Sequence, residues 1–271
     1  MNAFEAALPL LRCPLCAGRF ELTGRTLGCA AGHRFDLARQ GYVNLAVGSK
    51  ATGDTAAMVA AREEFLGAGH YAPIAAALAD RGVAGFVVDV GGGTGYYLAH
   101  VLERTGGSGV VVEVSAAALR RAARAHPRAA AVGADVWRGL PFADASADLV
   151  TTVFAPRSVP EVIRVLRPGG RWVIVTPLPE HLGEVRDVLG MVGVEERKAE
   201  RLHTDLEGFV DLTEAELRVP RRFDRAALRA LVLMGPSAHH VDAAALEERL
   251  AGLPDVVDVT VAVRLTAVTR P

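Results

Sequence analysis

The sequence is short of cysteine, of aromatic residues and of long apolar runs. Only 3 of its 271 residues are cysteine, and aromatic residues make up 6% of the chain. Three cysteines cannot all pair with one another, and Met1–Leu11 carries Glu5 without a cationic start, so it is a poor export signal. No apolar run approaches the length of a membrane span. We therefore expect a protein of the reducing cytoplasm, with neither a disulfide framework nor a membrane-spanning segment.

The chain also has little net charge. Its formal net charge is −1 and 51% of its residues are apolar, which suits one large α/β domain with a small appendage. The charge is uneven, because residues 10–50 hold six cations against Glu21 and Asp36, a local excess of four. The cations are Arg12, Arg19, Arg25, Arg34, Arg39 and Lys50. Such an excess is typical of a solvated surface, and beside a metal site it is also typical of a nucleic-acid-binding module.

The three cysteines form a motif with one histidine. Cys13 and Cys16 make a C-x2-C pair, twelve residues separate Cys16 from Cys29, and three separate Cys29 from His33. This spacing is typical of a closed, tetrahedral structural zinc site, although a disulfide with the third cysteine buried is the alternative. Because all four ligands come from protein, we expect the metal to organise the segment without taking part in chemistry.

The pattern of turns, helices and strands divides the chain into three segments. Up to about Leu45 the sequence indicates short strands and turns around the metal, Lys50–Asp54 indicates a mobile loop, and helices are expected from Thr55 and over Tyr71–Arg81. From residue 83 strands and helices alternate. We predict a zinc-binding module that recognises RNA (1–45), a helical linker (46–82) and a catalytic α/β domain (83–271).

The strands of the third segment are apolar on both faces, which predicts a parallel sheet covered by helices. They are expected at Phe86–Val90, Gly109–Val114, Ala130–Ala134, Ala147–Val153 and Arg171–Thr176. The helices between them are expected at Tyr96–Arg104, Ala116–Ala125 and Val159–Leu166. By contrast, Val256–Val268 alternates between hydrophobic and polar residues and predicts an antiparallel edge strand.

A glycine-rich turn links the first of these strands to its helix. The strand ends at Val90 and runs directly into Gly91-Gly-Gly-Thr-Gly95. Glycines let the backbone approach a ligand closely, but nicotinamide and flavin proteins use similar loops. Two acids favour S-adenosylmethionine instead. Asp89 lies two residues before the first glycine, and Glu113 ends the next strand, where its carboxylate can accept both ribose hydroxyls. The cofactor residues predicted from this pattern are Asp89, Gly91, Gly93, Gly95 and Glu113.

Asp135 follows the third strand and is placed to accept a hydrogen bond from the adenine amino group, although a helix-capping or loop acid is the alternative. The turn Leu166-Arg-Pro-Gly-Gly170 is frequent in class I methyltransferases. We therefore predict a class I, Rossmann-like α/β methyltransferase sheet with an N-terminal zinc-ribbon-like knuckle.

The sequence strongly resembles the bacterial 23S rRNA guanine-N1 methyltransferases, and within them the actinomycete branch that confers resistance to tylosin-type macrolides. The segments that carry the resemblance are Cys13-Pro-Leu-Cys16, Gly32-His-Arg-Phe-Asp36, Ala38-Arg-Gln-Gly-Tyr-Val-Asn-Leu45, Ala68-Gly-His-Tyr71, Val88-Asp-Val-Gly-Gly-Gly-Thr-Gly95, Phe154-Ala-Pro156 and Thr176-Pro177 with His181-Leu182. They cover the first two thirds of the chain in order.

The resemblance implies methylation of guanine N1 in a hairpin loop of 23S rRNA near the peptide exit tunnel. It also implies that Tyr71, Tyr97, Leu98 and His181 lie at the cofactor. The oligomeric state does not follow from the sequence, and a homodimer is one alternative.

Guanine N1 carries a proton, so the reaction needs a proton acceptor or a group that stabilises charge on O6. The candidates are Arg157 at O6, and His181 or a water as the proton acceptor, while Phe154 is either a stacking face or a core residue. Two other functions remain open: a small-molecule methyltransferase with a structural zinc, and a non-catalytic RNA-binding protein.

Overall fold

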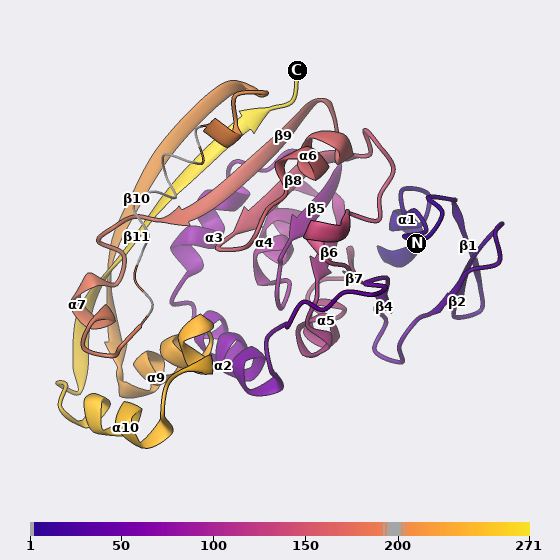
Figure 1. The fold of residues 1–271 in the computed structure, drawn as a ribbon. Helices are drawn as coiled ribbons and strands as arrows, with labels where there is room; N and C mark the ends of the chain where they lie inside the picture. The colour runs from indigo at the N-terminus through magenta and orange to yellow at the C-terminus, as the bar shows by residue number, and fades with distance from the viewer. Residues whose placement is uncertain (1–2, 192, 194–201, 203) are drawn as a thin grey trace.

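The computed structural model describes residues 3–191, 193, 202 and 204–271, and its centre is an eight-stranded sheet (Figure 1). The strand order is β10-β11-β9-β8-β5-β6-β7-β4. The strands are β4 (Val43–Asn44), β5 (Phe86–Val90), β6 (Ser108–Glu113), β7 (Ala129–Gly133), β8 (Ala147–Val153), β9 (Leu166–Pro177), β10 (Val210–Asp224) and β11 (Val256–Thr269). All neighbours pair in parallel except those of β11, which is antiparallel to both β9 and β10. The predicted parallel sheet is confirmed.

The order of the strands reverses at β5, because β6 and β7 lie on one side of it and β8 and β9 on the other. Open sheets of this kind bind ligands at the carboxyl ends of the strands beside such a switch point. Gly91, Asp135 and Phe154 follow the ends of β5, β7 and β8, and Glu113 ends β6. The fold therefore brings these candidate site residues, predicted from sequence, to one edge of the sheet.

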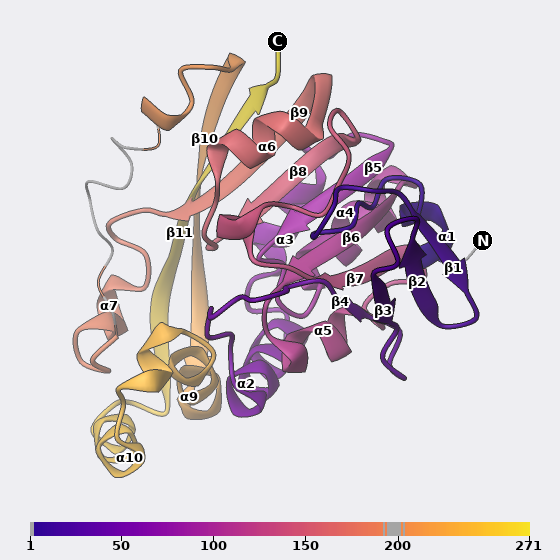
Figure 2. The ribbon, with the colours of Figure 1, turned by 45° about the vertical axis from the view of Figure 1, so that its right-hand side comes forward.

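Helices cover both faces of the sheet (Figures 1 and 2). One face packs against α2 (Ala56–Gly67), α3 (Ala72–Ala79), α4 (Tyr96–Thr105), α5 (Ala116–Ala122), α9 (Arg225–Leu233) and α10 (Ala243–Ala251). The other face packs against α1 (Ala3–Ala7) and α6 (Val159–Val165). Neighbouring residues of the inner strands alternate between the two faces, as Val87 and Val88 do, so β5 is buried on both faces. Among the described residues, no helix is both long and apolar enough to cross a membrane.

The N-terminal module is a small antiparallel sheet of β1 (Phe20–Thr23), β2 (Thr26–Cys29) and β3 (Arg34–Asp36). The short strands predicted around the metal are thus confirmed. The module is tied to the large sheet, because α1 packs on β6 and β7, Leu11 pairs with Phe142, and β4 joins β7. Contacts therefore cross residue 45, and the division into 1–45, 46–82 and 83–271 stays a prediction.

The chain between β4 and α2 runs along the carboxyl edge of the sheet (Figure 2). The hydroxyl of Ser49 donates to Oδ2 of Asp135 at 2.7 Å, and the hydroxyl of Ser115 donates to the carbonyl oxygen of Asp54 at 2.6 Å. Thr55 then caps α2 by accepting from the Met58 amide. The loop predicted at Lys50–Asp54 is therefore held at both ends by residues that follow β6 and β7.

The prediction of an edge strand at the C-terminus is wrong. β11 lies between β9 and β10, and β10 forms the edge. Most of β11 is buried, including Val261, Ala262 and Val263 in succession, whereas β10 is largely exposed. The alternation in β11 misled because two of its polar residues bind acids of β10: Arg264 forms an ion pair with Glu216, and the hydroxyl of Thr266 donates to Glu214.

Candidate functional site

The four predicted metal ligands converge in the N-terminal module. Nδ1 of His33 lies 3.5 Å from Sγ of Cys13 and 3.4 Å from Sγ of Cys29, and the Sγ atoms of Cys16 and Cys29 are 3.6 Å apart. All four ligand atoms lie within 4.8 Å of one another. Cys13 and Cys16 precede β1, Cys29 ends β2, and His33 precedes β3, so the hairpin brings both pairs together.

These distances test whether zinc fits. Tetrahedral zinc with bonds of about 2.3 Å to sulfur and about 2.0 Å to nitrogen places two sulfurs about 3.8 Å apart, and a sulfur and a nitrogen about 3.6 Å apart. These three separations, 3.6 Å between sulfurs and 3.4–3.5 Å between sulfur and nitrogen, lie within about 0.2 Å of the expected values. The donor set of three thiolates and one imidazole is that of a closed structural zinc site, which leaves no position for a substrate.

The glycine loop follows β5 and precedes α4. Gly91, Gly93 and Gly95 have φ angles of 67°, 56° and 80°, in the left-handed region that side chains other than glycine rarely adopt. A Cβ added at Gly91 would lie 2.5 Å from Cβ of Ala155, so the segment after β8 also needs a glycine there. The amide of Gly91 donates to the Val112 carbonyl at 2.8 Å, which fixes the loop against β6.

Asp89 lies beneath this loop and is 1% exposed. Its Oδ1 accepts a hydrogen bond from the Thr151 hydroxyl at 2.7 Å, while its Oδ2 is buried without a partner in the described part of the chain. Burial raises the pKa of Asp89 to about 6, against the Thr151 hydrogen bond and with a further upward contribution from Glu113. An unsatisfied buried acceptor beside a glycine loop fits a site that receives the cationic amino-acid end of S-adenosylmethionine.

Glu113 fixes the turn that follows β6. Its Oε1 accepts from the amides of Val114 and Ser115 at 2.7 and 2.9 Å, and its Oε2 accepts from the Gly93 amide at 3.2 Å. The carboxylate thus couples the end of β6 to the glycine loop. A carboxylate has about four acceptor positions, so Oε2 retains room for a hydroxyl donor. The ribose contact stays a prediction.

Asp135 caps a turn of 3-10 helix, η1 (Val136–Arg138). Its Oδ1 accepts from the Trp137 amide at 3.1 Å, and its Oδ2 accepts from the Ser49 hydroxyl at 2.7 Å. The capping alternative is therefore confirmed, and the adenine contact stays a prediction. Trp137, which the sequence did not single out, is 68% exposed directly beside this cap.

Tyr71 and His181 meet in a buried pair, although 110 residues separate them. The Tyr71 hydroxyl lies 3.1 Å from Nε2 of His181, and the backbone amide of Ala262 donates to Nδ1 of His181 at 3.1 Å. Burial lowers the pKa of His181 to about 4 and raises the pKa of Tyr71 well above its usual value, so both are neutral. Because an amide can only donate, Nδ1 must be the acceptor and the ring proton must sit on Nε2.

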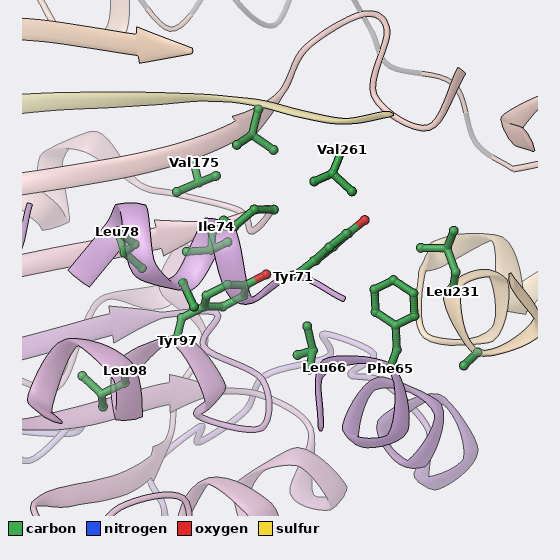
Figure 3. Close-up of a cluster of buried hydrophobic side chains, with 14 of the residues drawn as sticks. Phe65, Leu66, Tyr71, Ile74, Leu78, Tyr97, Leu98, Val175, Leu231 and Val261 are labelled. Carbon is green, nitrogen blue, oxygen red and sulfur yellow. The ribbon is translucent and has the colours of Figure 1, made fainter. Parts of the chain in front are cut away.

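Aromatic rings surround this pair. Figure 3 shows Tyr71 between Val261 of β11 and Leu66 of α2, with Tyr97 of α4 beside it. The ring of Phe154 lies 6.1 Å from that of Tyr71 and 5.8 Å from that of His181. Phe154 is 41% exposed, so it is not a core residue, and its role as a stacking face stays a prediction. Its φ of 51° lies in the left-handed region.

The two α4 residues differ in their surroundings. Tyr97 is 9% exposed and its hydroxyl points toward Tyr71 (Figure 3). Leu98 is fully buried, with its side chain against Gly109 of β6. Any ligand contact of Leu98 must therefore come from its backbone, near the start of α4.

Arg157 follows β8 closely and is half-buried, and its Nε is buried without a partner among the residues that the structure describes. Burial lowers the pKa of Arg157, and Asp205 opposes that shift. A guanidinium donor left without an acceptor at the carboxyl edge can bind an oxygen of a ligand there. The candidate role at guanine O6 is compatible with this position and stays a prediction.

Together the strand order, the glycine loop after β5 and the acid at the end of β6 define a class I methyltransferase. Residues 87–170 match the family described as methyltransferase domain, and residues 11–50 match the zinc ribbon described as RlmA, N-terminal. A solved phosphoethanolamine N-methyltransferase 2 from Haemonchus contortus, in complex with S-adenosyl-L-methionine, shares the fold. It is 15% identical, has a TM-score of 0.51, and the match covers 80% of this chain and 57% of that one.

Similarity to proteins of known name runs along the whole chain. The 23S rRNA (guanine(748)-N(1))-methyltransferase of Streptomyces fradiae is 46% identical over 96% of both chains. A putative 23S rRNA (guanine-N(1)-)-methyltransferase of Micromonospora griseorubida is 46% identical over 95% of this chain and 96% of its own length. A Bacillus subtilis protein with the same putative description is 28% identical over 84% of this chain and 86% of its own. The chain belongs to the bacterial 23S rRNA (guanine-N1)-methyltransferase family, with S-adenosylmethionine as cofactor and zinc in the ribbon.

Proposed function

We propose that this enzyme methylates N1 of a guanine in a hairpin loop of 23S rRNA near the peptide exit tunnel. The name of the Streptomyces fradiae relative points to guanine 748 as the target. The observation that carries the proposal is that this match spans both the zinc ribbon and the sheet, 96% of each chain. A cytoplasmic enzyme that protects ribosomes from tylosin-type macrolides would follow, and a homodimer stays a prediction.

The N-terminal module supplies cations for a polyanion. Arg19, Arg34 and Arg39 are at least partly exposed, and none has an ion-pair partner in the part of the chain that the structure describes. Arg25 differs, because it donates to the carbonyls of Leu37 and Ala38 and so holds the module together. Free arginines on a zinc-stabilised sheet are suited to phosphate contacts.

Exposed aromatic rings at the carboxyl edge suit an unpaired base. Phe154 is 41% exposed and Trp137 is 68% exposed, and they follow β8 and β7. Bases in hairpin loops are recognised by stacking on aromatic rings and by contacts to their edges. In our proposal the target guanine leaves the loop and stacks on Phe154, next to Tyr71 and His181.

When bound, S-adenosylmethionine supplies a methyl group on a sulfonium, which nitrogen can accept by in-line displacement. The protein must hold N1 in line and take up its proton. Arg157 offers a donor for O6, which lowers the cost of removing that proton. The Ala262 amide occupies the only free lone pair of neutral His181, which supports water as the acceptor over this histidine.

The test is to map the methyl mark on rRNA. A methyl at N1 blocks Watson–Crick pairing, so reverse transcriptase should stop at one guanine of 23S rRNA in cells that express the gene and should read through in cells without it. The matched control expresses Glu113→Ala, which keeps the zinc ribbon and loses the predicted ribose acceptor. Purified enzyme should methylate a hairpin transcript and fail on the same transcript with adenine at the target. A protein that binds S-adenosylmethionine yet leaves every rRNA position unmarked would instead be a small-molecule methyltransferase.

A further inference from the structure

We propose that Arg62 binds the carboxylate of the amino-acid end of S-adenosylmethionine, a role that rests on the proposed function. Arg62 lies on α2, outside the sheet and outside every motif that the sequence singled out. The helix places its guanidinium over the glycine loop. A Cβ added at Gly93 would lie 3.2 Å from Nη1 of Arg62 and 3.7 Å from its Cδ.

The packing of α2 fixes this position. One turn after Arg62, the ring of Phe65 packs edge-to-face against Tyr71, with ring centroids 4.9 Å apart, and against Phe223 at 5.4 Å. Figure 3 shows Phe65 and Leu66 on the side of α2 that faces Tyr71. Both residues are buried, so the helix cannot rotate without breaking this contact, and Arg62 stays over the loop.

The guanidinium itself is held from two sides and retains donors. It forms an ion pair with Asp54, and Nη2 donates to the carbonyl oxygen of Met234 at 2.6 Å. Its side chain is only 23% exposed. A guanidinium has five N–H groups, and these contacts use two of them. The remaining donors make a preorganised site for a carboxylate, which arginine binds in a bidentate geometry.

The charges around the loop make such a cation necessary. Asp89 lies beneath the loop and Glu113 contacts Gly93, so both carboxylates attract the ammonium and sulfonium groups of the cofactor and repel its carboxylate. Burial raises the pKa of Tyr97 well above its usual value, and Arg62 opposes this shift. Arg62 thus acts on a buried residue of the site as well as lying over Gly93.

The experiment compares two ligands that differ only in the carboxylate. Isothermal calorimetry on the zinc-loaded, full-length protein should measure the affinity for S-adenosylmethionine and for decarboxylated S-adenosylmethionine, which keeps the ammonium and the sulfonium. Arg62→Met should weaken binding of S-adenosylmethionine about 10- to 100-fold, as expected for the removal of charge-assisted hydrogen bonds. Its affinity for the decarboxylated ligand should change less than about twofold, because that ligand offers no acceptor to Arg62.

Three further variants separate this role from a structural one. Arg121→Met removes another arginine that pairs with α2, through Glu63, and should leave both affinities unchanged. Asp54→Asn breaks the ion pair and keeps Arg62, so the preference for the carboxylate should persist. Arg62→Lys keeps the charge, should fold if the methionine variant does not, and should retain part of the preference.

Equal weakening of both ligands in the folded Arg62 variants, or no weakening of either, would overturn the proposal. If the wild-type protein bound neither ligand, the proposed function itself would fail, and the two failures are therefore distinguishable.

Discussion

Nε2 of His181 lies 3.1 Å from the hydroxyl oxygen of Tyr71, and the proton between them belongs to the histidine. The Ala262 amide of β11 occupies Nδ1, so the neutral ring can only donate through Nε2. The Tyr71 hydroxyl accepts this bond, and its own proton is free to be donated into the site. The pair thus links β11, at the far side of the sheet, to a tyrosine at the start of α3.

Acid should destabilise the protein through His181. Its pKa is about 4 in the folded protein against an ordinary value of 6.5, so the unfolded chain binds the proton more readily. The contribution of His181 to the free energy of unfolding is fully present above pH 6.5 and is lost as the pH falls toward 4. The loss is about 2 kcal/mol at pH 5 and about 3 kcal/mol in total. Urea unfolding at pH 7 and pH 5 should show this loss in the wild type and its absence in His181→Gln.

The comparison with His181→Gln is needed because Asp89 acts in the opposite direction. Its pKa is about 6 in the folded protein, so protonation of Asp89 stabilises the fold as the pH falls through 6. Both proteins keep Asp89, and the difference between them reports His181. Parallel pH profiles in the two proteins would contradict the lowered pKa and the burial of His181.

The ribose contact is tested at Glu113. Glu113→Gln keeps the shape of the side chain and can still accept from the amides of Val114 and Ser115 through its carbonyl oxygen. It removes the charge, and we expect S-adenosylhomocysteine to bind about 10- to 100-fold more weakly, as for the removal of charge-assisted hydrogen bonds. Calorimetry measures this affinity. Glu103→Gln on α4 removes a surface acid outside the site and is the control. Unchanged affinity would move the ribose contact elsewhere.

The metal site is tested by exchanging its ligands. Cys16→Ser should lose stoichiometric zinc and loosen the N-terminal module, because a structural zinc contributes folding free energy to so small a sheet. His33→Cys creates a four-cysteine site and should retain zinc. Elemental analysis and limited proteolysis of residues 1–45 measure both effects. If elemental analysis found no stoichiometric metal in freshly purified, reduced wild-type protein, the assignment of the zinc site would be wrong.

The proposed phosphate contacts of the N-terminal module are tested at Arg34 and Arg39. Replacing both with alanine should weaken binding of the hairpin transcript and flatten its salt dependence, by about 0.7–0.9 of a slope unit for each phosphate that the variant no longer neutralises. Cofactor affinity should not change. The control, Arg104→Ala with Arg222→Ala, removes two exposed arginines from α4 and β10. If both double variants bind RNA like the wild type, the sheet alone must hold the substrate.

Phe154 should act on the RNA and not on the cofactor. Phe154→Ala removes the exposed ring beside Tyr71 and His181, and loss of one stacked base costs roughly 1–3 kcal/mol. We expect a lower kcat/KM for the transcript, with unchanged affinity for S-adenosylhomocysteine, and recovery in Phe154→Tyr. Loss of cofactor affinity in Phe154→Ala would instead assign the ring to the cofactor pocket.

Local sequence determined the parts of this protein whose geometry depends on near neighbours. The C-x2-C pair, Cys29 and His33 lie close along the chain, and a single hairpin closes them around one point. The glycine loop joins a strand to the next helix, so the spacing of residues along the chain is enough to predict its left-handed glycines and the acid that precedes it. The alternation of buried strands and helices likewise predicted the parallel sheet.

Tertiary structure decided what depends on distant segments. The sequence pattern predicted that β11 is an edge strand, because that pattern could not show that β10 would pair with its outer side. An arginine in the middle of α2 looks like a surface residue until the packing of Phe65 brings it over Gly93. Likewise the proton of His181 is fixed by an amide of β11, 81 residues away in the chain. Such contacts depend on how whole elements pack, which residue spacing does not encode.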